Sequence, residues 1–362
     1  MTDPVTQPAL HTRACDLFGV RYPIVQTGMG WVAGARLTAA TSAAGGLGVL
    51  ASATMSVPEL AQAIATVKDR TDLPFGVNLR SDQPDVDDRI ALLVREGVKV
   101  ASFAQAPGER LVKMLKDQGV VVMPTVGARR HAEKVAAWGV DAVIAQGAEG
   151  GGHTGTVPTS LLLPQVCEAV DIPVIAAGGF FDGRGLVAAL AYGAAGVAMG
   201  TRFLLSAESR VPDAVKARYL AAGVTDTVVT KQIDGHPQRV IRTELVDHLD
   251  GAGRATALPR SLRNALRFRS LSGRSLRDLA REGIAMRKSQ GLSWAQVAMA
   301  ANAPMLTKAA LVDGRLDTGV LPTGQVVGVI DALPTVEAIV SSVMAEAVAV
   351  LARLGSPPPG PQ

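Results

Sequence analysis

The chain has 362 residues, a formal net charge of +4, and 48% hydrophobic residues. It is long for one compact domain, and it has enough apolar residues to bury a large core. Its two cysteines, Cys15 and Cys167, lie far apart and outside any metal-binding or redox spacing. The cysteine usage therefore predicts a reducing compartment and no disulfide framework.

The positive charge is concentrated in one segment. Between Arg254 and Lys288 there are nine Arg and one Lys against Asp278 and Glu282, a balance of +8, so the remaining residues carry −4, the difference between +4 and +8. The charge pattern and the lack of a recognition module argue against nucleic-acid binding. Residues 1–10 lack the apolar core of a signal peptide, and no apolar run approaches the ~20 residues of a membrane span. We expect a cytoplasmic protein that binds neither nucleic acid nor a membrane.

Along the chain, short apolar runs end in polar or glycine-rich turns and alternate with helical stretches. The predicted strands are Pro23–Gln26, Leu47–Ala51, Phe75–Leu79, Val98–Phe103, Val120–Thr125, Ala142–Gln146, Val174–Ala177 and Gly196–Met199. Their apolar residues are continuous rather than alternating, which is typical of parallel strands covered on both faces. At the helix-to-strand joints, Gly97, Gly119, Gly139 and Gly196 are predicted to take the left-handed conformation that ends a helix.

Eight strand–helix repeats favour an α/β fold of the (β/α)8 TIM-barrel type. The rival fold is a doubly wound sheet that binds a dinucleotide. Its glycine fingerprint occurs once, over Gly150–Gly155, but the next strand ends in Ala177-Gly178-Gly179 without the acidic residue that such a site uses. We therefore treat this match as coincidental.

After the eighth strand the repeat stops. A helix is predicted over Val211–Ala222, then a hairpin of Thr227–Ile233 and Gln238–Arg242 turning at Asp234-Gly235, and finally a C-terminal helix over Thr335–Arg353. The predicted organisation is a barrel over residues 1–222, a basic and mainly helical segment over 223–318, a return to the barrel over 319–355, and a frayed tail over 356–362.

Glycine-rich turns follow the last two predicted strands. Gly178-Gly179 and Gly200-Thr201 occupy the loops that hold a phosphate in many (β/α)8 barrels, and glycine lets a phosphate approach the backbone N–H groups. A helix beginning near Gly183, capped by Asp182, would add a favourable dipole. Each glycine pair alone is equally consistent with a tight turn, and Gly45-Gly46 is interpreted as a helix cap.

Several ordered motifs resemble the nitronate monooxygenase (2-nitropropane dioxygenase-like) flavoproteins. They are Pro23–Gly30, Ala44–Gly48, Pro74–Asn78, Gln146–His153, Ala176–Gly179, Met199–Phe203 and Thr323–Gly328. The resemblance covers nearly the whole chain and implies FMN at the C-terminal end of the barrel. The residues expected to bind it are Thr27, Gly28, Met29, Asn78, Gln146, Gly151, Gly178, Gly179, Gly200 and Thr201. Of these, the amides of Asn78 and Gln146 suit the polar edge of the flavin ring.

His153 is the predicted catalytic residue. It follows three glycines at the end of the sixth strand and matches the histidine that the family places near the flavin. An imidazole can take a proton from a substrate C–H group or stabilise a developing oxyanion. The alternative is a loop histidine bonded to a carbonyl. No two histidines share a metal-binding spacing, and we predict no metal site.

Two features depart from nitronate oxidisers. The stretch Ala101–Pro107, at the end of the fourth strand, lacks the histidine and the Phe-Gly pair of those enzymes. In the basic segment, Arg260, Arg263, Arg267 and Arg274 recur at helical spacing, which suits a polyanion such as the phosphates of coenzyme A. The alternative for this segment is a solvated face or a subunit contact in a homo-oligomer.

The motifs Gln26–Ala35 and Gly178–Gly185 resemble an actinobacterial branch of the family that acts in steroid C/D-ring breakdown on an indanone-propionyl-CoA intermediate. The first hypothesis is thus an FMN-dependent oxidoreductase that introduces or reduces a C=C bond next to a carbonyl in a CoA thioester of steroid (cholesterol) catabolism. The alternatives are a nitronate monooxygenase that uses O2 and a non-catalytic flavin-binding barrel.

Overall fold

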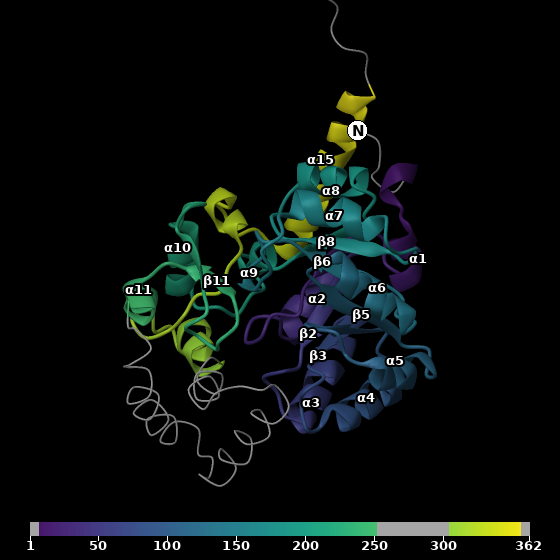
Figure 1. Cartoon of the computed structure of the whole chain (residues 1–362), viewed down its shortest axis with the longest axis horizontal. Coiled ribbons are helices and arrows are strands. Elements are labelled where there is room, and N and C mark those ends of the chain that lie inside the picture. Colours follow the sequence, from purple (N-terminus) through teal and green to yellow (C-terminus); the bar gives the residue numbers. More distant parts are fainter. Residues whose placement is uncertain (1–6, 252–303, 356–362) are drawn as a thin grey trace, which may run out of the picture. The chain divides into compact units, whose positions relative to one another are not determined.

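The computed structural model describes residues 7–251 and 304–355. Eight parallel strands form a closed barrel in chain order, which confirms the predicted (β/α)8 fold (Figure 1). They are β1 (Ile24–Gln26), β2 (Leu47–Ala51), β3 (Phe75–Leu79), β4 (Val100–Phe103), β5 (Val121–Val126), β6 (Val143–Gln146), β8 (Val174–Ala177) and β9 (Gly196–Met199). The last strand closes the barrel on the first, with Val25 paired to Ala198.

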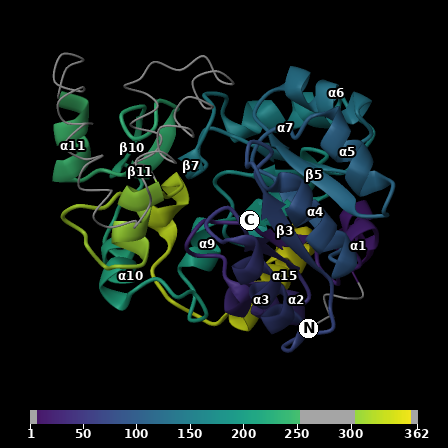
Figure 2. The same cartoon turned by 90° about the horizontal axis from the view of Figure 1, so that it is seen from below.

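Helices cover the outside of the barrel, and Figure 2 shows α3 to α7 following one another around the strands. Their bounds are η2 (Pro8–Leu10, 3₁₀), α1 (Arg13–Phe18), α2 (Ala35–Ala43), α3 (Val57–Lys68), α4 (Val86–Arg95), α5 (Glu109–Lys116), α6 (Arg129–Ala137), α7 (Thr159–Cys167), α8 (Gly183–Ala191), α9 (Thr201–Leu204) and α15 (Val336–Leu354). The C-terminal helix α15 packs between α8 and α2. A Cβ on Gly183 would lie 2.5 Å from Val343 O, so the close approach of α8 to α15 requires glycine there.

The interior of the barrel is apolar. Its buried cluster comprises Val25, Leu47, Val49, Val100, Val121, Met123, Ala142, Ile144, Ile175, Ala177 and Ala198, with Ala14 and Phe18 contributed by α1. Because α1 immediately precedes β1, its two side chains cover the N-terminal end of the barrel. Phe18 is 1% exposed, and burying such a side chain stabilises the fold by about 2–3 kcal/mol.

The glycines at the helix-to-strand joints follow the prediction at three positions of four. Gly97, Gly119 and Gly139 have φ values of +66°, +71° and +84°. The prediction for Gly196 is wrong, because this residue begins β9 and its Cβ would lie 2.6 Å from Pro23 O. The left-handed residue after α8 is Gly193, with φ +92°.

The chain divides into two compact units. The barrel unit comprises the described residues up to Gly150, Thr154–Arg210 and the residues from Val329 onward; the hairpin unit comprises Gly151–His153 and Val211–Gly328. The chain thus enters the hairpin unit for three residues after β6 and returns.

The hairpin unit contains an antiparallel sheet of order β10-β11-β7, where β10 is Thr227–Thr230, β11 is Gln238–Ile241 and β7 is Gly152–His153. Among the residues that the structure describes, the unit also contains α10 (Asp213–Leu220), α11 (Glu244–Gly251), a helix over residues 304–311 and η4 (Gln325–Val329, 3₁₀). The predicted hairpin is confirmed. β7 was not expected, because a glycine-rich stretch carries no local strand signal.

Candidate active site

A layer of neutral polar side chains lies at the C-terminal end of the barrel interior. Val25, Met123 and Ile144 point into the apolar core, and side chains two residues apart on a strand point to the same side. The same alternation places Ser102 above Val100, and Asn78 Nδ2 donates to Ser102 Oγ at 3.0 Å. The layer consists of Thr27, Asn78, Ser102, Thr125 and Gln146.

Three members of this polar layer, Thr27, Asn78 and Gln146, are predicted cofactor-binding residues, and each is half-buried. Ser102 and Thr125 were not predicted. The signal that identifies them is the inside–outside alternation along β4 and β5, which a continuous apolar strand hides from sequence reading. Together these groups offer hydrogen-bond donors and acceptors without any ionisable side chain.

The turn after β1 lies directly on the polar layer. A Cβ on Gly28 would stand 2.3 Å from Asn78 Cβ, so only glycine allows the backbone to pass there. Two residues beyond Met29, Trp31 has φ +67°. Among the described residues, it is the one non-glycine residue with a positive φ. Such a conformation costs about 1–2 kcal/mol and is commonly found at functional sites. Between Thr27 and Gly30, the turn presents little bulk besides the side chain of Met29.

The loop after β8 exposes backbone in the manner expected of a phosphate clamp. Gly178 and Gly179 have φ values of +98° and +84°. A Cβ on Gly178 would lie 3.0 Å from Thr159 Oγ1, so this glycine fits tight packing. A Cβ on Gly179 would meet nothing nearer than Glu149 Cβ at 3.7 Å, which leaves its backbone accessible.

Gly200 differs from this pair. Its φ is −101°, so a left-handed backbone does not explain the glycine. Its Cβ would lie 3.2 Å from Thr27 Oγ1 and 3.4 Å from Met29 Sδ. Gly200 therefore brings the β9 turn close to the β1 turn, and Thr201 follows it as the buried first residue of α9.

Carboxylates occupy the N-terminus of α8. Asp182 Oδ1 accepts from Gly185 N at 2.8 Å, which confirms the predicted cap, and Glu346 Oε2 accepts from Gly183 N at 2.7 Å. These two acidic groups already interact with the positive end of the helix dipole. That this dipole assists a bound phosphate stays a prediction, and the exposed backbone of Gly179 is the better candidate for the phosphate contact.

Glu149 joins the loops after β6 and β8. Its Oε2 accepts from Thr159 N at 3.0 Å and lies 2.6 Å from Thr159 Oγ1. The same hydroxyl lies 3.1 Å from Gly178 O. This network fixes the backbone that presents Gly179, and no local pattern in the sequence predicts it.

His153 lies in a cluster of polar side chains within the hairpin unit. Its Nε2 lies 2.6 Å from Asp234 Oδ2 and 3.2 Å from Gln238 Nε2. The ring of His236 stands edge-on to that of His153, with the centroids 6.1 Å apart. The side chain of His153 is 59% exposed, whereas that of Asp234 is only 10% exposed.

Asp234 is held as a carboxylate. Burial alone would raise the pKa of Asp234, but the hydrogen bond and positive charge of His153, with donation from His236 N and Gln238, bring that pKa below its ordinary value. In the sequence, Asp234 is recognisable only as a turn residue. The structure brings it to His153 through the pairing of β7 with β11, in which His153 stands opposite Gln238.

The remaining predicted site residues fall elsewhere. Gly151 packs within the hairpin unit, where its Cβ would lie 2.4 Å from Gly324 N. Arg260, Arg263, Arg267 and Arg274 lie outside the described residues. Within residues 7–251 and 304–355, no cluster of three or more His, Cys, Asp or Glu side chains is placed to bind a metal. In the same ranges, no helix has the length and apolarity needed to cross a membrane.

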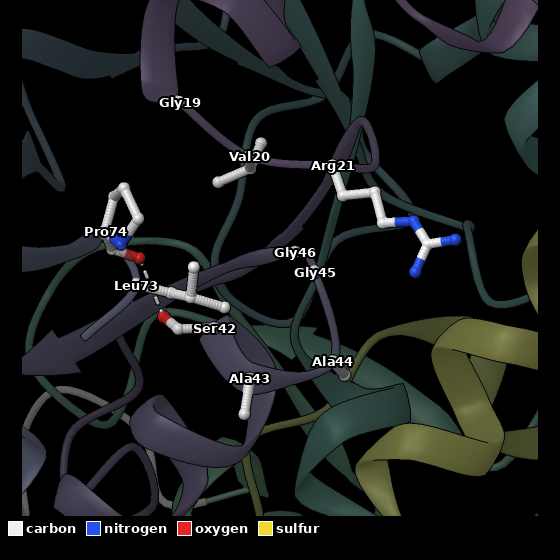
Figure 3. A pocket seen from close by; sticks show the side chains of 10 residues that line it. All are labelled: Gly19, Val20, Arg21, Ser42, Ala43, Ala44, Gly45, Gly46, Leu73 and Pro74. Carbon is white, nitrogen blue, oxygen red and sulfur yellow. Dashed lines mark hydrogen bonds between the residues drawn. The ribbon is translucent and has the colours of Figure 1, made fainter. Parts of the chain in front are cut away.

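A cavity of about 230 Å³ lies at the opposite end of the barrel, among residues that precede β1, β2 and β3 (Figure 3). Its lining includes Arg21, Ser42 and Pro74, and Ser42 Oγ donates to Pro74 O at 2.9 Å. Because (β/α)8 barrels carry their chemistry at the C-terminal end of the strands, this cavity is not the candidate active site.

Comparison with known proteins places the chain among flavoenzymes of one family. The model of the nitronate monooxygenase family matches residues 11–92 and 85–346. The chain therefore belongs to the nitronate monooxygenase family, and it is an oxidoreductase. Membership implies a flavin cofactor.

Two curated relatives are similar over nearly their whole length, and both are named (3aS,4S,5R,7aS)-5-hydroxy-7a-methyl-1-oxo-octahydro-1H-indene-4-carboxyl-CoA dehydrogenase. The protein of Mycobacterium tuberculosis (strain ATCC 25618 / H37Rv) is 59% identical, with 94% of this chain and 96% of the relative covered. That of Rhodococcus jostii (strain RHA1) is 57% identical, with 96% and 98% covered. Among solved structures, FabK from Thermotoga maritima has a TM-score of 0.76 and 35% identity, with 95% of this chain and 98% of that one covered.

Proposed function

We propose that the protein is an FMN-dependent dehydrogenase of a bicyclic CoA thioester formed in steroid C/D-ring breakdown. The observation that carries the proposal is the similarity to two dehydrogenases named for an indene-carboxyl-CoA thioester, at 59% and 57% identity over nearly the whole chain. Those names specify a carboxyl-CoA in place of the propionyl-CoA expected from the sequence, so the proposed thioester carbonyl is attached directly to the ring.

Features of the barrel unit support FMN as the proposed cofactor. The neutral polar layer of Thr27, Asn78, Ser102, Thr125 and Gln146 suits the hydrogen-bonding edge of a flavin ring, and the turn at Gly28 leaves room for its flat face. Gly179, exposed and left-handed, would present backbone N–H groups to the single phosphate that distinguishes FMN from a dinucleotide. When bound, the flavin supplies two-electron oxidation or reduction.

His153 is the proposed acid–base residue. A C–H bond next to a thioester carbonyl is far more acidic than an ordinary C–H bond, because the negative charge left behind spreads onto the carbonyl oxygen, and a positioned imidazole can act as the base that takes its proton. The exposure of His153 and its hydrogen bond with the buried carboxylate of Asp234 support this role. In the reverse direction the same imidazole would return the proton.

The substrate's coenzyme A portion is assigned to the basic segment. Arg260, Arg263, Arg267 and Arg274 recur at three- to seven-residue intervals, and guanidinium groups bind phosphates well because they can form two parallel hydrogen bonds. The sequence pattern alone supports this assignment.

The second candidate function is oxidation of alkyl nitronates with O2, which the matching family model favours. Against it stands the end of β4, where Ser102 and the fully buried Phe103 precede residues that include neither the histidine nor the Phe-Gly pair of nitronate oxidisers.

The decisive experiment is an anaerobic titration of the purified full-length protein loaded with FMN. We expect a bicyclic carboxyl-CoA thioester to bleach the flavin absorption band in a single turnover, and a matched thioester without hydrogen on the carbon next to the carbonyl to leave it unchanged. Rapid O2 consumption with propionate 3-nitronate, without bleaching by the thioester, would instead establish the second candidate. Failure of the protein to bind FMN would refute both.

A further inference from the structure

The carboxylate of Asp234 receives donors on both of its oxygens. Oδ1 accepts from His236 N at 3.0 Å, and Oδ2 lies 2.6 Å from His153 Nε2 and 2.5 Å from Gln238 Nε2. With its side chain 10% exposed, this carboxylate is largely removed from water. Its hydrogen bonds to His153 and Gln238 are therefore stronger than they would be at an exposed position.

The distances determine which ring nitrogen of His153 carries a proton. Asp234 Oδ2 is an ionised acceptor, so a separation of 2.6 Å from Nε2 requires a proton between the two atoms. Gln238 must then turn its amide nitrogen toward the carboxylate, since its carbonyl oxygen would be repelled there. The neutral ring of His153 accordingly carries its hydrogen on Nε2 and its lone pair on Nδ1.

The local backbone holds this arrangement. His153 is paired with Gln238 across the β7–β11 ladder, and the turn between β10 and β11 closes through Gly235 N donating to Lys231 O at 2.9 Å. Gly235 has φ +90°, which a glycine adopts without strain. Asp234 thus reaches His153 from a hydrogen-bonded turn.

We propose that Asp234 is the positioning residue of His153. It selects the tautomer with the proton on Nε2, directs Nδ1 as the basic atom, and stabilises the imidazolium once a proton has been taken up. Gln238 keeps the carboxylate in place. This inference rests on the proposed function, in which His153 handles the substrate proton, and it adds the residues that orient the ring.

The test begins with the unaltered, FMN-loaded full chain labelled with ¹⁵N in its histidines. We expect the nitrogen resonances of neutral His153 to show hydrogen on Nε2. In Asp234→Asn, the side-chain amide would donate to Nε2, and the hydrogen should move to Nδ1. A wild-type spectrum with hydrogen on Nδ1, or a folded Asp234→Asn variant with an unchanged tautomer, would overturn the inference.

Turnover provides the second measurement. Asp234→Asn should lower kcat about 10- to 1,000-fold with little change in KM or flavin content, because the ring stays in place but presents the wrong nitrogen. The control is Asp247→Asn, which removes an exposed ion pair with Arg242 in the same unit and should leave both tautomer and kcat unchanged. If His153→Ala left turnover intact, the acid–base role proposed for His153 would fail, whereas the ¹⁵N spectrum would still decide whether Asp234 sets the tautomer of His153.

Discussion

The two units of the chain differ in the chemistry of their polar groups. At the C-terminal end of the barrel unit, the polar layer is neutral, and its amides and hydroxyls cannot change charge near neutral pH. The hairpin unit, by contrast, holds two ionisable side chains in hydrogen-bond contact, His153 and Asp234, with His236 beside them. Under the proposed function, binding of the flavin and transfer of a proton would depend on separate parts of the chain, so we expect that each can be altered while the other is retained.

The largest effect on flavin binding alone is expected from Gly179→Val. The new side chain would stand over the backbone proposed to hold the phosphate, and we expect FMN affinity to fall by about two orders of magnitude or more. The matched control is Gly139→Val, because Gly139 has the same φ of +84° and nothing within 4 Å of its Cβ. Both variants bear a similar backbone strain of about 1–2 kcal/mol.

Flavin content after gel filtration, together with chemical denaturation, distinguishes these variants. Equal loss of stability with flavin lost only in Gly179→Val supports the clamp. Stoichiometric flavin in Gly179→Val would show that the phosphate binds elsewhere.

His153→Ala tests the acid–base role proposed for the hairpin unit. We expect this variant to retain FMN and to lose about two to four orders of magnitude in turnover of the thioester, the usual effect of removing a positioned acid–base group. His131→Ala, an exposed position on α6, is the control and should behave as wild type. A flavin-loaded His153→Ala enzyme with normal turnover would leave His153 as an ordinary loop residue.

The smallest effect is expected from charge reversal in the basic segment. Replacing Arg263 and Arg267 by Glu should raise the KM for the CoA thioester by up to about tenfold and leave FMN content unchanged, because interactions between exposed charges are individually weak. The control for net charge is Arg95→Glu combined with Arg110→Glu, at exposed positions on α4 and α5, because it reverses the same number of arginines. The wild-type KM should also rise with salt. A changed oligomer size with an unchanged KM would identify the segment as a subunit contact instead.

The signals that predicted the barrel are local. Each strand is an apolar run, and Gly97, Gly119 and Gly139 mark the helix ends because their left-handed backbone is a property of a single residue. Asp182 likewise caps a helix that begins beside it. The hairpin of β10 and β11 follows from Asp234-Gly235 between two β-branched runs. The family motifs predicted that Thr27, Asn78, Gln146 and Gly179 lie at the C-terminal end of the barrel.

The rest required tertiary structure, because it depends on groups far apart in the sequence. Gly196 carries the same local signal as Gly139, yet the approach of Pro23 O explains it. Ser102 and Thr125 belong to the polar layer only once the barrel defines an inside. His153 and Asp234 are 81 positions apart, and no property of either residue predicts the other. The pairing of β11 with β7 brings the two residues together. The sequence by itself therefore determined His153 as the candidate acid–base residue, and only the tertiary structure decided that Asp234 is its carboxylate partner.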